Sequence, residues 1–163
     1  MRIPGRIRAW LRRRASLWRR RRAPGSEASA PAAGGRRDAG RWGEAVAERL
    51  LRQKGLRFLG RRVRVGRRGE IDLLFRDGRT LIFVEVKTRA DERFGRPSEA
   101  VDRGKRQRLS RAAMRYVRTL RDKPDYLRFD VIEVVGTPDT AEPPAVRHIE
   151  NAFPLEGRFY IPW

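Results

Sequence analysis

The stretch Gly69-Glu70-Ile71-Asp72-Leu73-Leu74-Phe75 is followed, beyond Asp77-Gly78, by Leu81-Ile82-Phe83-Val84-Glu85-Val86-Lys87. Both runs are apolar, and the second is rich in β-branched residues, which predicts two buried strands. Asp-Gly between such runs is typical of a hairpin turn. The two strands carry acids where apolar side chains are expected, so this hairpin decides the fold and also poses the question of function.

The faces of this hairpin follow from the alternation of side chains along a strand. If the strands pair across the turn, Asp72 lies on the same side of the sheet as Glu85 and Lys87. Three charged groups then meet at the open end of the hairpin. In the second strand, one face is expected to hold Leu81, Phe83, Glu85 and Lys87; in the first, Glu70, Asp72 and Leu74 are expected opposite Ile71, Leu73 and Phe75.

These charges have two interpretations, because an unpaired buried carboxylate is strongly destabilising. The first is a structural ion pair, Glu85–Lys87 or Asp72–Lys87, at a strand end open to water. The second is a site for Mg²⁺ or Mn²⁺, because Mg²⁺ binds one or two protein carboxylates and completes its shell with water and phosphate oxygens. Asp72 and Glu85 are then the expected ligands, with the main-chain carbonyl of Val86. Lys87 would orient or activate the attacking water, or neutralise charge developing on the phosphate.

The choice of lysine at position 87 is unusual for this chain. Its 40 basic residues are 36 arginines and only four lysines. An ammonium is compact and its pKa shifts readily, whereas a guanidinium is a rigid and permanently charged fork. Lys87 therefore supports a special role, although Lys54, Lys105 and Lys123 indicate that lysines also occur without one.

Several short motifs match one known family: Gly43-Glu44, Glu48, Gly69–Asp72, Val84–Arg89 and Ser98–Val101. On these motifs, residues 40 to about 135 resemble the YraN-like family of small bacterial proteins, whose function is unsettled. That family is similar to Holliday-junction resolvases of the restriction-endonuclease-like, PD-(D/E)xK superfamily. Ile71 stands where the superfamily pattern has proline, as is usual in the resolvase-like branch.

The resemblance implies catalytic roles for Asp72, Glu85 and Lys87, and for Glu44 as the acid supplied by the first helix. The implied fold is α/β, with a central mixed sheet of about five strands flanked by helices. The implied function is a divalent-metal-dependent endonuclease acting on DNA, including branched or damaged DNA. Because the superfamily has inactive members, the alternative is a non-catalytic nucleic-acid-binding module. A homodimer is also expected, since resolvase-like relatives often dimerise.

The formal net charge of +20 favours nucleic acid, and DNA first, as the partner. A GC-rich genome would also produce many arginines, and residues 1–35 contribute ten arginines and one glutamate to the total. The basic residues expected to contact nucleic acid are Arg67, Arg68, Arg89, Arg103, Lys105 and Arg106.

The composition of residues 1–37 predicts a disordered, arginine-rich tail and linker. An α/β nuclease-like domain is expected over residues 38–163. The tail can be read as a nucleic-acid arm, a membrane-surface anchor, a solvated segment or an upstream start codon assigned too early. No apolar run reaches the roughly 18 residues needed to span a bilayer. The absence of cysteine fits a reducing compartment, so a bacterial cytoplasmic location is expected.

The remaining elements follow from periodicity and caps. A helix is expected from Asp38 or Ala39 to Gly55, with Glu44 at the edge of a stripe formed by Trp42, Val46 and Leu50. His148, the only histidine, is expected to be structural or exposed. The other expected elements are a leading strand with an irregularity at Gly60, a helix over 98–120 capped by Ser98 and weakened at Gly104, a strand over 126–135 and an edge strand over 146–149.

Overall fold

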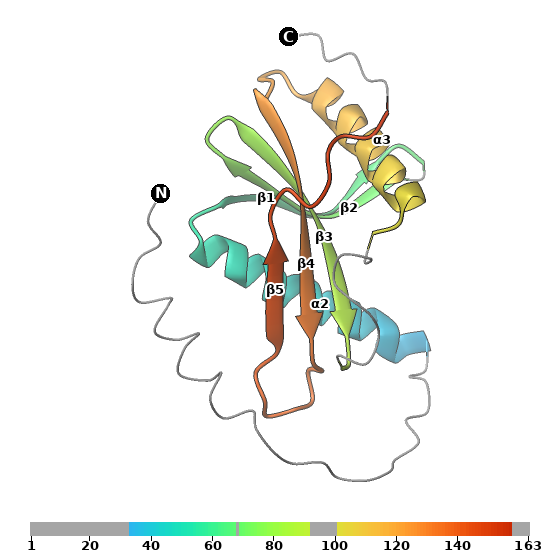
Figure 1. The fold of residues 1–163 in the computed structure, drawn as a ribbon, viewed down its shortest axis with the longest axis vertical. Helices are drawn as coiled ribbons and strands as arrows, with labels where there is room; N and C mark the ends of the chain where they lie inside the picture. The colour runs from blue at the N-terminus through green and yellow to red at the C-terminus, as the bar shows by residue number, and fades with distance from the viewer. Residues whose placement is uncertain (1–32, 68, 92–100, 158–163) are drawn as a thin grey trace. The chain divides into compact units, whose positions relative to one another are not determined.

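The computed structural model describes residues 33–67, 69–91 and 101–157, so the predicted tail up to residue 32, Arg68, and the predicted cap Ser98 lie outside the described residues. Figure 1 shows seven elements within these ranges. In chain order they are α2 (Ala33–Gln53), β1 (Arg57–Val65), β2 (Gly69–Asp77), β3 (Thr80–Arg89), α3 (Arg103–Thr119), β4 (Tyr126–Val135) and β5 (Ala145–Ile149).

The strands form one mixed sheet in the order β1-β2-β3-β4-β5. Neighbouring strands are antiparallel except β3 and β4, which are parallel and are connected through α3. The hairpin at Asp77-Gly78 is confirmed, since Asp77 pairs with Thr80 and Gly78 has φ +55°. The expected α/β architecture with a five-stranded mixed sheet is therefore confirmed.

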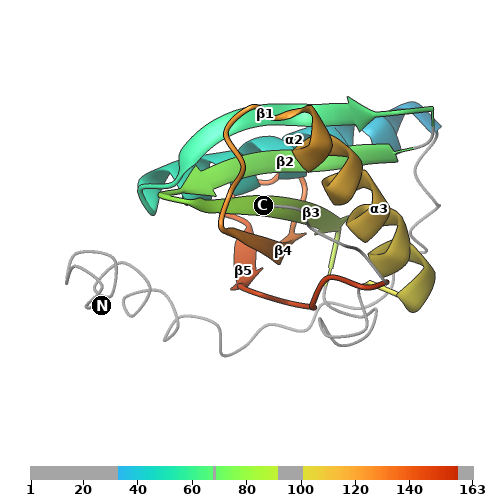
Figure 2. The same cartoon turned by 90° about the horizontal axis from the view of Figure 1, so that it is seen from above.

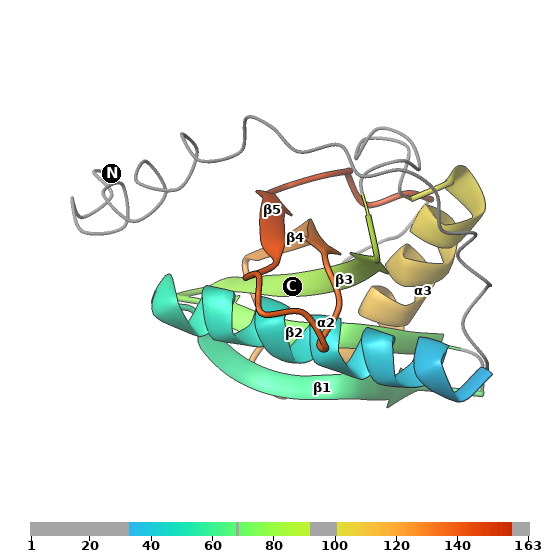
Figure 3. The same ribbon diagram turned by 90° about the horizontal axis from the view of Figure 1, so that it is seen from below.

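The two helices cover opposite faces of the sheet (Figures 2 and 3). On one face, α3 packs on Phe83 and Phe129 through a stripe centred on Ala113. On the other, α2 packs on Val84 and Ile132. The central strands β2 and β3 are buried on both sides, which is why they read as near-continuous apolar runs.

The ends of the helices agree only in part with expectation. Gly55, with φ +85°, follows α2 as the expected C-terminal glycine, and its N–H donates to the Arg52 carbonyl. However, α2 begins at Ala33, ahead of the expected Asp38. Helix α3 begins at Arg103 and runs through Gly104, because the Asp102 side chain caps it by accepting the Lys105 N–H at 2.8 Å.

The buried line of α2 is displaced from the predicted stripe. Ala47 and Leu51 are fully buried, whereas Trp42, Val46 and Leu50 are only partly buried. A close approach at Gly43 explains this orientation. A Cβ at Gly43 would overlap the Thr88 side chain, so only glycine lets α2 approach the end of β3 there.

Replacing Gly43 by Ala is therefore expected to destabilise the protein by about 1–3 kcal/mol, the usual effect of overpacking a tight contact. Gly40→Ala is the matched control, because its Cβ would have nothing within 4 Å. That change should stabilise the helix by up to about 1 kcal/mol. Urea unfolding of both variants measures the difference. Equal stabilities would contradict the close contact.

The predicted alternation in β2 is wrong at one place. Leu73 and Phe75 face α2, but Ile71 lies with Leu74 in the cluster on the α3 side. The faces change over at Asp72, where the pairing of β2 with β3 has ended at Leu73↔Val84. On the neighbouring strand β1, Arg62 lies opposite Asp72 and has a left-handed backbone with φ +50°. The expected irregularity at Gly60 is present as well, as a register shift between Phe58 and Gly60.

Candidate metal and phosphodiester site

Where the pairing of β2 with β3 ends, the side chain of Asp72, instead of the backbone of β2, forms a hydrogen bond to β3. Its Oδ2 accepts the Val86 N–H at 2.9 Å. The carboxylate thus occupies the place of the next ladder hydrogen bond, where the two strands separate. In a strand, the N–H and C=O of one residue point toward the same neighbour. The Val86 carbonyl therefore faces the same gap, beside Asp72.

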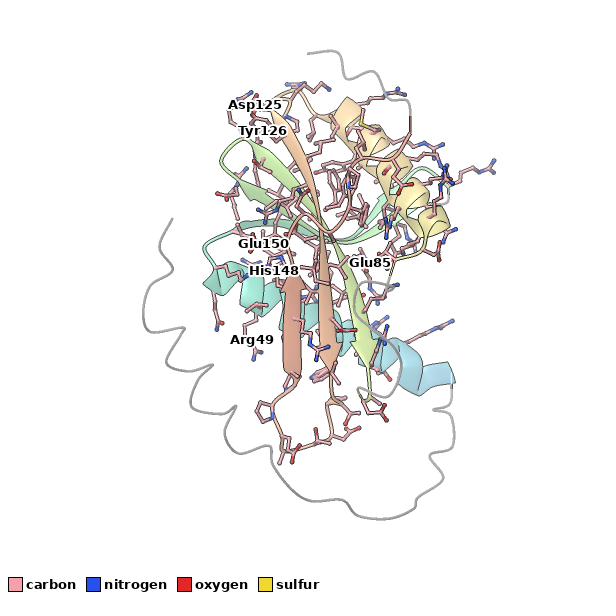
Figure 4. All side chains as sticks on the ribbon, in the orientation of Figure 1. Arg49, Glu85, Asp125, Tyr126, His148 and Glu150 are labelled. Atoms are coloured by element: carbon pink, nitrogen blue, oxygen red, sulfur yellow. The ribbon has the colours of Figure 1, made fainter. Side chains whose placement is uncertain are left out.

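Glu85, the next residue along β3, is buried with 3% of its surface exposed. Figure 4 shows it beside the start of α3. Two lysines flank its carboxylate: Lys87 Nζ lies 2.8 Å from Oε1, and Lys105 Nζ lies 3.0 Å from Oε2. Despite this ion pair, Oε2 has no hydrogen-bond partner among the described residues. The two lysines therefore balance the charge of the Glu85 carboxylate, but its hydrogen bonding is incomplete.

The two carboxylates interact electrostatically. Burial, and then the negative charge of Glu85, raises the pKa of Asp72 from 3.8 to about 7. The Val86 N–H and the Lys105 charge oppose this rise. A carboxyl group with such a pKa favours a proton or another cation near it. The site thus attracts positive charge even with two lysines present.

Glu44 is buried on α2, and its hydrogen-bond partner is an arginine. The Arg62 guanidinium binds it in bidentate fashion, with donor–acceptor distances of 2.8–3.1 Å. The charge of Glu44 also contributes to the raised pKa of Asp72, and the hydrogen bond to Glu44 raises the pKa of Arg62. The structure therefore brings Glu44 near the Asp72 site, with Arg62 as its direct partner.

The donor set fits a hard divalent cation of low protein coordination. Among the described residues, no group of three or more His, Cys, Asp or Glu could hold a metal ion. Mg²⁺ needs only one or two carboxylates and keeps several waters, so Asp72, Glu85 and the Val86 carbonyl meet its requirements. Oε2 of Glu85 lacks a hydrogen bond but lies 3.0 Å from the Lys105 ammonium, so it could ligate a metal only in place of that contact. A structural zinc site, which needs four protein ligands, does not fit.

The residues expected to contact nucleic acid fall into two groups. Arg67 and Arg103 are exposed, with no ion pair to another described residue. Arg89 pairs instead with the buried Glu133 at 3.5 Å. Arg106 donates to the Val101 carbonyl and lies over Phe153, and Lys105 contacts Glu85.

Sequence reasoning placed basic residues at the start of this helix but did not identify the full row of exposed arginines along α3 or the role of Arg62. Arg108, Arg111, Arg115 and Arg118 are exposed at spacings of three and four residues, which places them on one face of the helix. We call these four residues the α3 arginine row. Their period was readable from the sequence; the left-handed backbone of Arg62 was not.

His148 is structural, as expected. Its Nε2 lies 2.9 Å from Asp130 Oδ2, and its Nδ1 lies 2.6 Å from Lys54 Nζ. Because an ammonium only donates, Nδ1 accepts and Nε2–H donates to Asp130. Burial alone would raise the pKa of Asp130, but hydrogen bonds from His148, Asn151 and Arg128 hold it below its usual value. Figure 4 shows His148 and Glu150 on β5 and just after it, in a different region from Glu85.

Comparison with known proteins agrees with the motifs. Residues 43–134 match the family described as "Uncharacterised protein family UPF0102". A UPF0102 protein of Symbiobacterium thermophilum is 46% identical over 117 residues, which cover 72% of this chain and 97% of that protein. Another from Syntrophotalea carbinolica is 43% identical over 118 residues, covering 72% and 93%. A third, from Geotalea daltonii, is 45% identical over 118 residues, covering 71% and 89%.

Proposed function

The chain belongs to the uncharacterised protein family UPF0102, as the YraN-like resemblance implied, and on this premise we propose that it is a divalent-metal-dependent endonuclease acting on DNA. The restriction-endonuclease-like fold is part of the same proposal. It is supported by the mixed five-stranded sheet with a helix on each face.

One observation carries the proposal: the Asp72 carboxylate sits on the Val86 amide, next to the buried Glu85, with its pKa raised to about 7. Two acids held together in a largely buried position, against their mutual repulsion, are typical of a functional site. The left-handed Arg62 beside them adds backbone strain, which also concentrates at such sites.

Each residue has a proposed role. Asp72, Glu85 and the Val86 carbonyl would hold Mg²⁺ or Mn²⁺, which when bound supplies Lewis acidity toward a phosphate oxygen and activates water. Lys87, anchored on Glu85, would orient the attacking water or neutralise charge developing on the phosphate. Glu44 would position Arg62 close to Asp72.

The α3 arginine row supports a polyanionic substrate. Its four guanidinium groups have no carboxylate within ion-pair distance among the described residues, unlike Arg89 or Arg128. The row starts one turn from Lys105, which reaches Glu85. At its middle, Arg115 reaches the β1–β2 turn, since a Cβ at Gly66 would lie 3.1 Å from Arg115 Nη1. A DNA backbone on this row would lead toward the two carboxylates.

Replacing Arg111 and Arg115 together by Gln is expected to weaken DNA binding at low salt. It should reduce the slope of log affinity against log salt by about 1.8, because each phosphate contact releases about 0.9 counterion. The control, Arg49→Gln with Arg57→Gln, removes the same charge from exposed positions on α2 and β1. Fluorescence anisotropy with labelled duplex measures both slopes. Identical slopes in the two double variants would exclude this face as the binding surface.

The test of function is cleavage of labelled duplex, single-stranded and four-way-junction DNA with Mg²⁺, Mn²⁺ or EDTA. We expect metal-dependent cleavage that Asp72→Asn removes and Asp77→Asn, at the exposed end of the same strand, retains. Cleavage that survives unchanged in Asp72→Asn would rule out the assignment of the site.

A second candidate is a nucleic-acid-binding module without catalysis. It is favoured because the buried acids already form ion pairs within the protein: Glu85 pairs with two lysines, and Glu44 pairs with Arg62. Metal titration separates the candidates. A pure binder should show no carboxylate-dependent affinity for Mn²⁺ while its DNA binding keeps a steep salt dependence.

A further inference from the structure

Lys105 occupies a distinctive position for a basic residue at the start of a helix. Its ammonium lies 3.0 Å from Glu85 Oε2, the carboxylate oxygen without a hydrogen-bond partner among the described residues. Its charge also acts on Asp72. The ammonium therefore contacts one carboxylate and acts electrostatically on the other, and a divalent cation bound by Glu85 would take the same contact.

The surroundings make this contact removable. Lys87 already compensates the other oxygen of Glu85, at 2.8 Å. The backbone of Lys105 is fixed, because its N–H is held by the Asp102 cap. Its side chain keeps 29% exposure and is flexible, so the ammonium can leave Glu85 for water or for a phosphate without disturbing α3.

We propose that Lys105 is an exchangeable counter-ion: it neutralises Glu85 when no metal is present, and a divalent cation must displace it. This inference rests on the proposed function, since it takes Glu85 as a metal ligand. Once displaced, the ammonium is available at the end of the α3 arginine row, where it can pair with a substrate phosphate. Lys105 thereby makes metal binding and nucleic-acid binding mutually favourable, as a positioning residue for both.

The test is Mn²⁺ affinity of the full chain, measured by titration calorimetry without nucleic acid. Lys105→Met should bind Mn²⁺ about tenfold more tightly than the unmodified protein, because it removes a unit charge that competes for the same carboxylate. Lys105→Arg, which keeps the charge, should bind no more tightly. Arg49→Met is the matched control, since it removes one exposed charge on α2 without contacting Glu85, and its affinity should change less than about twofold.

Three results discriminate between outcomes. A tighter Lys105→Met with an unchanged Arg49→Met supports the inference. Equal shifts in these two variants, with binding lost in Glu85→Gln, would overturn the role of Lys105 and leave the metal site standing. Mn²⁺ binding that is absent, or unaffected by Glu85→Gln, would overturn both proposals. Lys105→Gln serves as a second variant, and circular dichroism confirms that each protein is folded.

Discussion

Glu85→Gln is expected to reduce metal-dependent DNA cleavage by at least about a hundredfold, the scale of losing one electrostatic contact at a reacting centre. The amide keeps the size of the side chain and removes the charge that would bind the metal. It also removes the anion that holds Lys87 and Lys105. Both lysines are partly exposed, so water can solvate them and the fold should persist.

This result is measured as the initial rate of four-way-junction cleavage at saturating Mg²⁺. Glu150→Gln is the control, because it removes an exposed acid that also pairs with a lysine, Lys54. It should cleave at the unmodified rate. A Glu85→Gln protein as active as Glu150→Gln would place the chemistry elsewhere.

Asp72→Asn should stabilise the metal-free protein at pH 8. The folded-state pKa of about 7 lies above the ordinary value of 3.8, mainly because of burial and then because of Glu85. The fold therefore prefers protonated Asp72. The stability gained from that proton is fully present below about pH 4 and is lost as the pH rises through 7.

At pH 8 the ionised carboxylate opposes folding by at most about 4 kcal/mol, the equivalent of this change in pKa. Partial exposure reduces the expected gain of Asp72→Asn to about 2–3 kcal/mol. The Asn carbonyl can still accept the Val86 N–H, so that contact is retained. Urea unfolding in EDTA at pH 8 and pH 4 measures the gain, which should disappear at the lower pH.

Asp125→Asn gives the opposite expectation. Its pKa is lowered by the hydrogen bond from Arg79, so the ionised form favours the fold. Its replacement should reduce stability at pH 8. If the two substitutions shift stability in the same direction, the electrostatic account of Asp72 is wrong.

Much of this fold could be predicted because the strands carry local sequence signals. β3 contains an apolar run rich in β-branched residues, and the Asp77-Gly78 turn indicates its partner, so the hairpin followed directly. The strand over 126–135 was predicted with its bounds from its apolar residues Phe129, Val131 and Ile132. The acids Asp72 and Glu85 stood out because strands rarely bury charge.

What could not be predicted depends on contacts between distant residues. The change of face at Asp72 arises because a side chain replaces a ladder hydrogen bond, and no alternation rule contains that event. The burial of Glu44 depends on the approach of Gly43 to Thr88, across the sequence from α2 to β3. The cap of α3 is Asp102, whose side chain accepts the Lys105 N–H, and periodicity alone did not point to this residue.

The lysines illustrate the same point. Only Lys87 was singled out from the sequence, yet all four have defined partners. Lys123 donates to the carbonyls of Val117, Arg118 and Leu120 at the end of α3, and its three donors suit three acceptors in a way a planar fork does not. The other contacts are Lys54 with His148 and Glu150, and Lys87 and Lys105 with Glu85.

The small number of lysines in this chain has a practical consequence. An acylating reagent, or an enzyme that acetylates lysine, would leave the arginine surface untouched and act only on these four contacts and the terminal amine. A single acetyl group would therefore alter an internal interaction while removing one charge of many. Mass spectrometry of partially acylated protein would then rank the four contacts by how often each one opens.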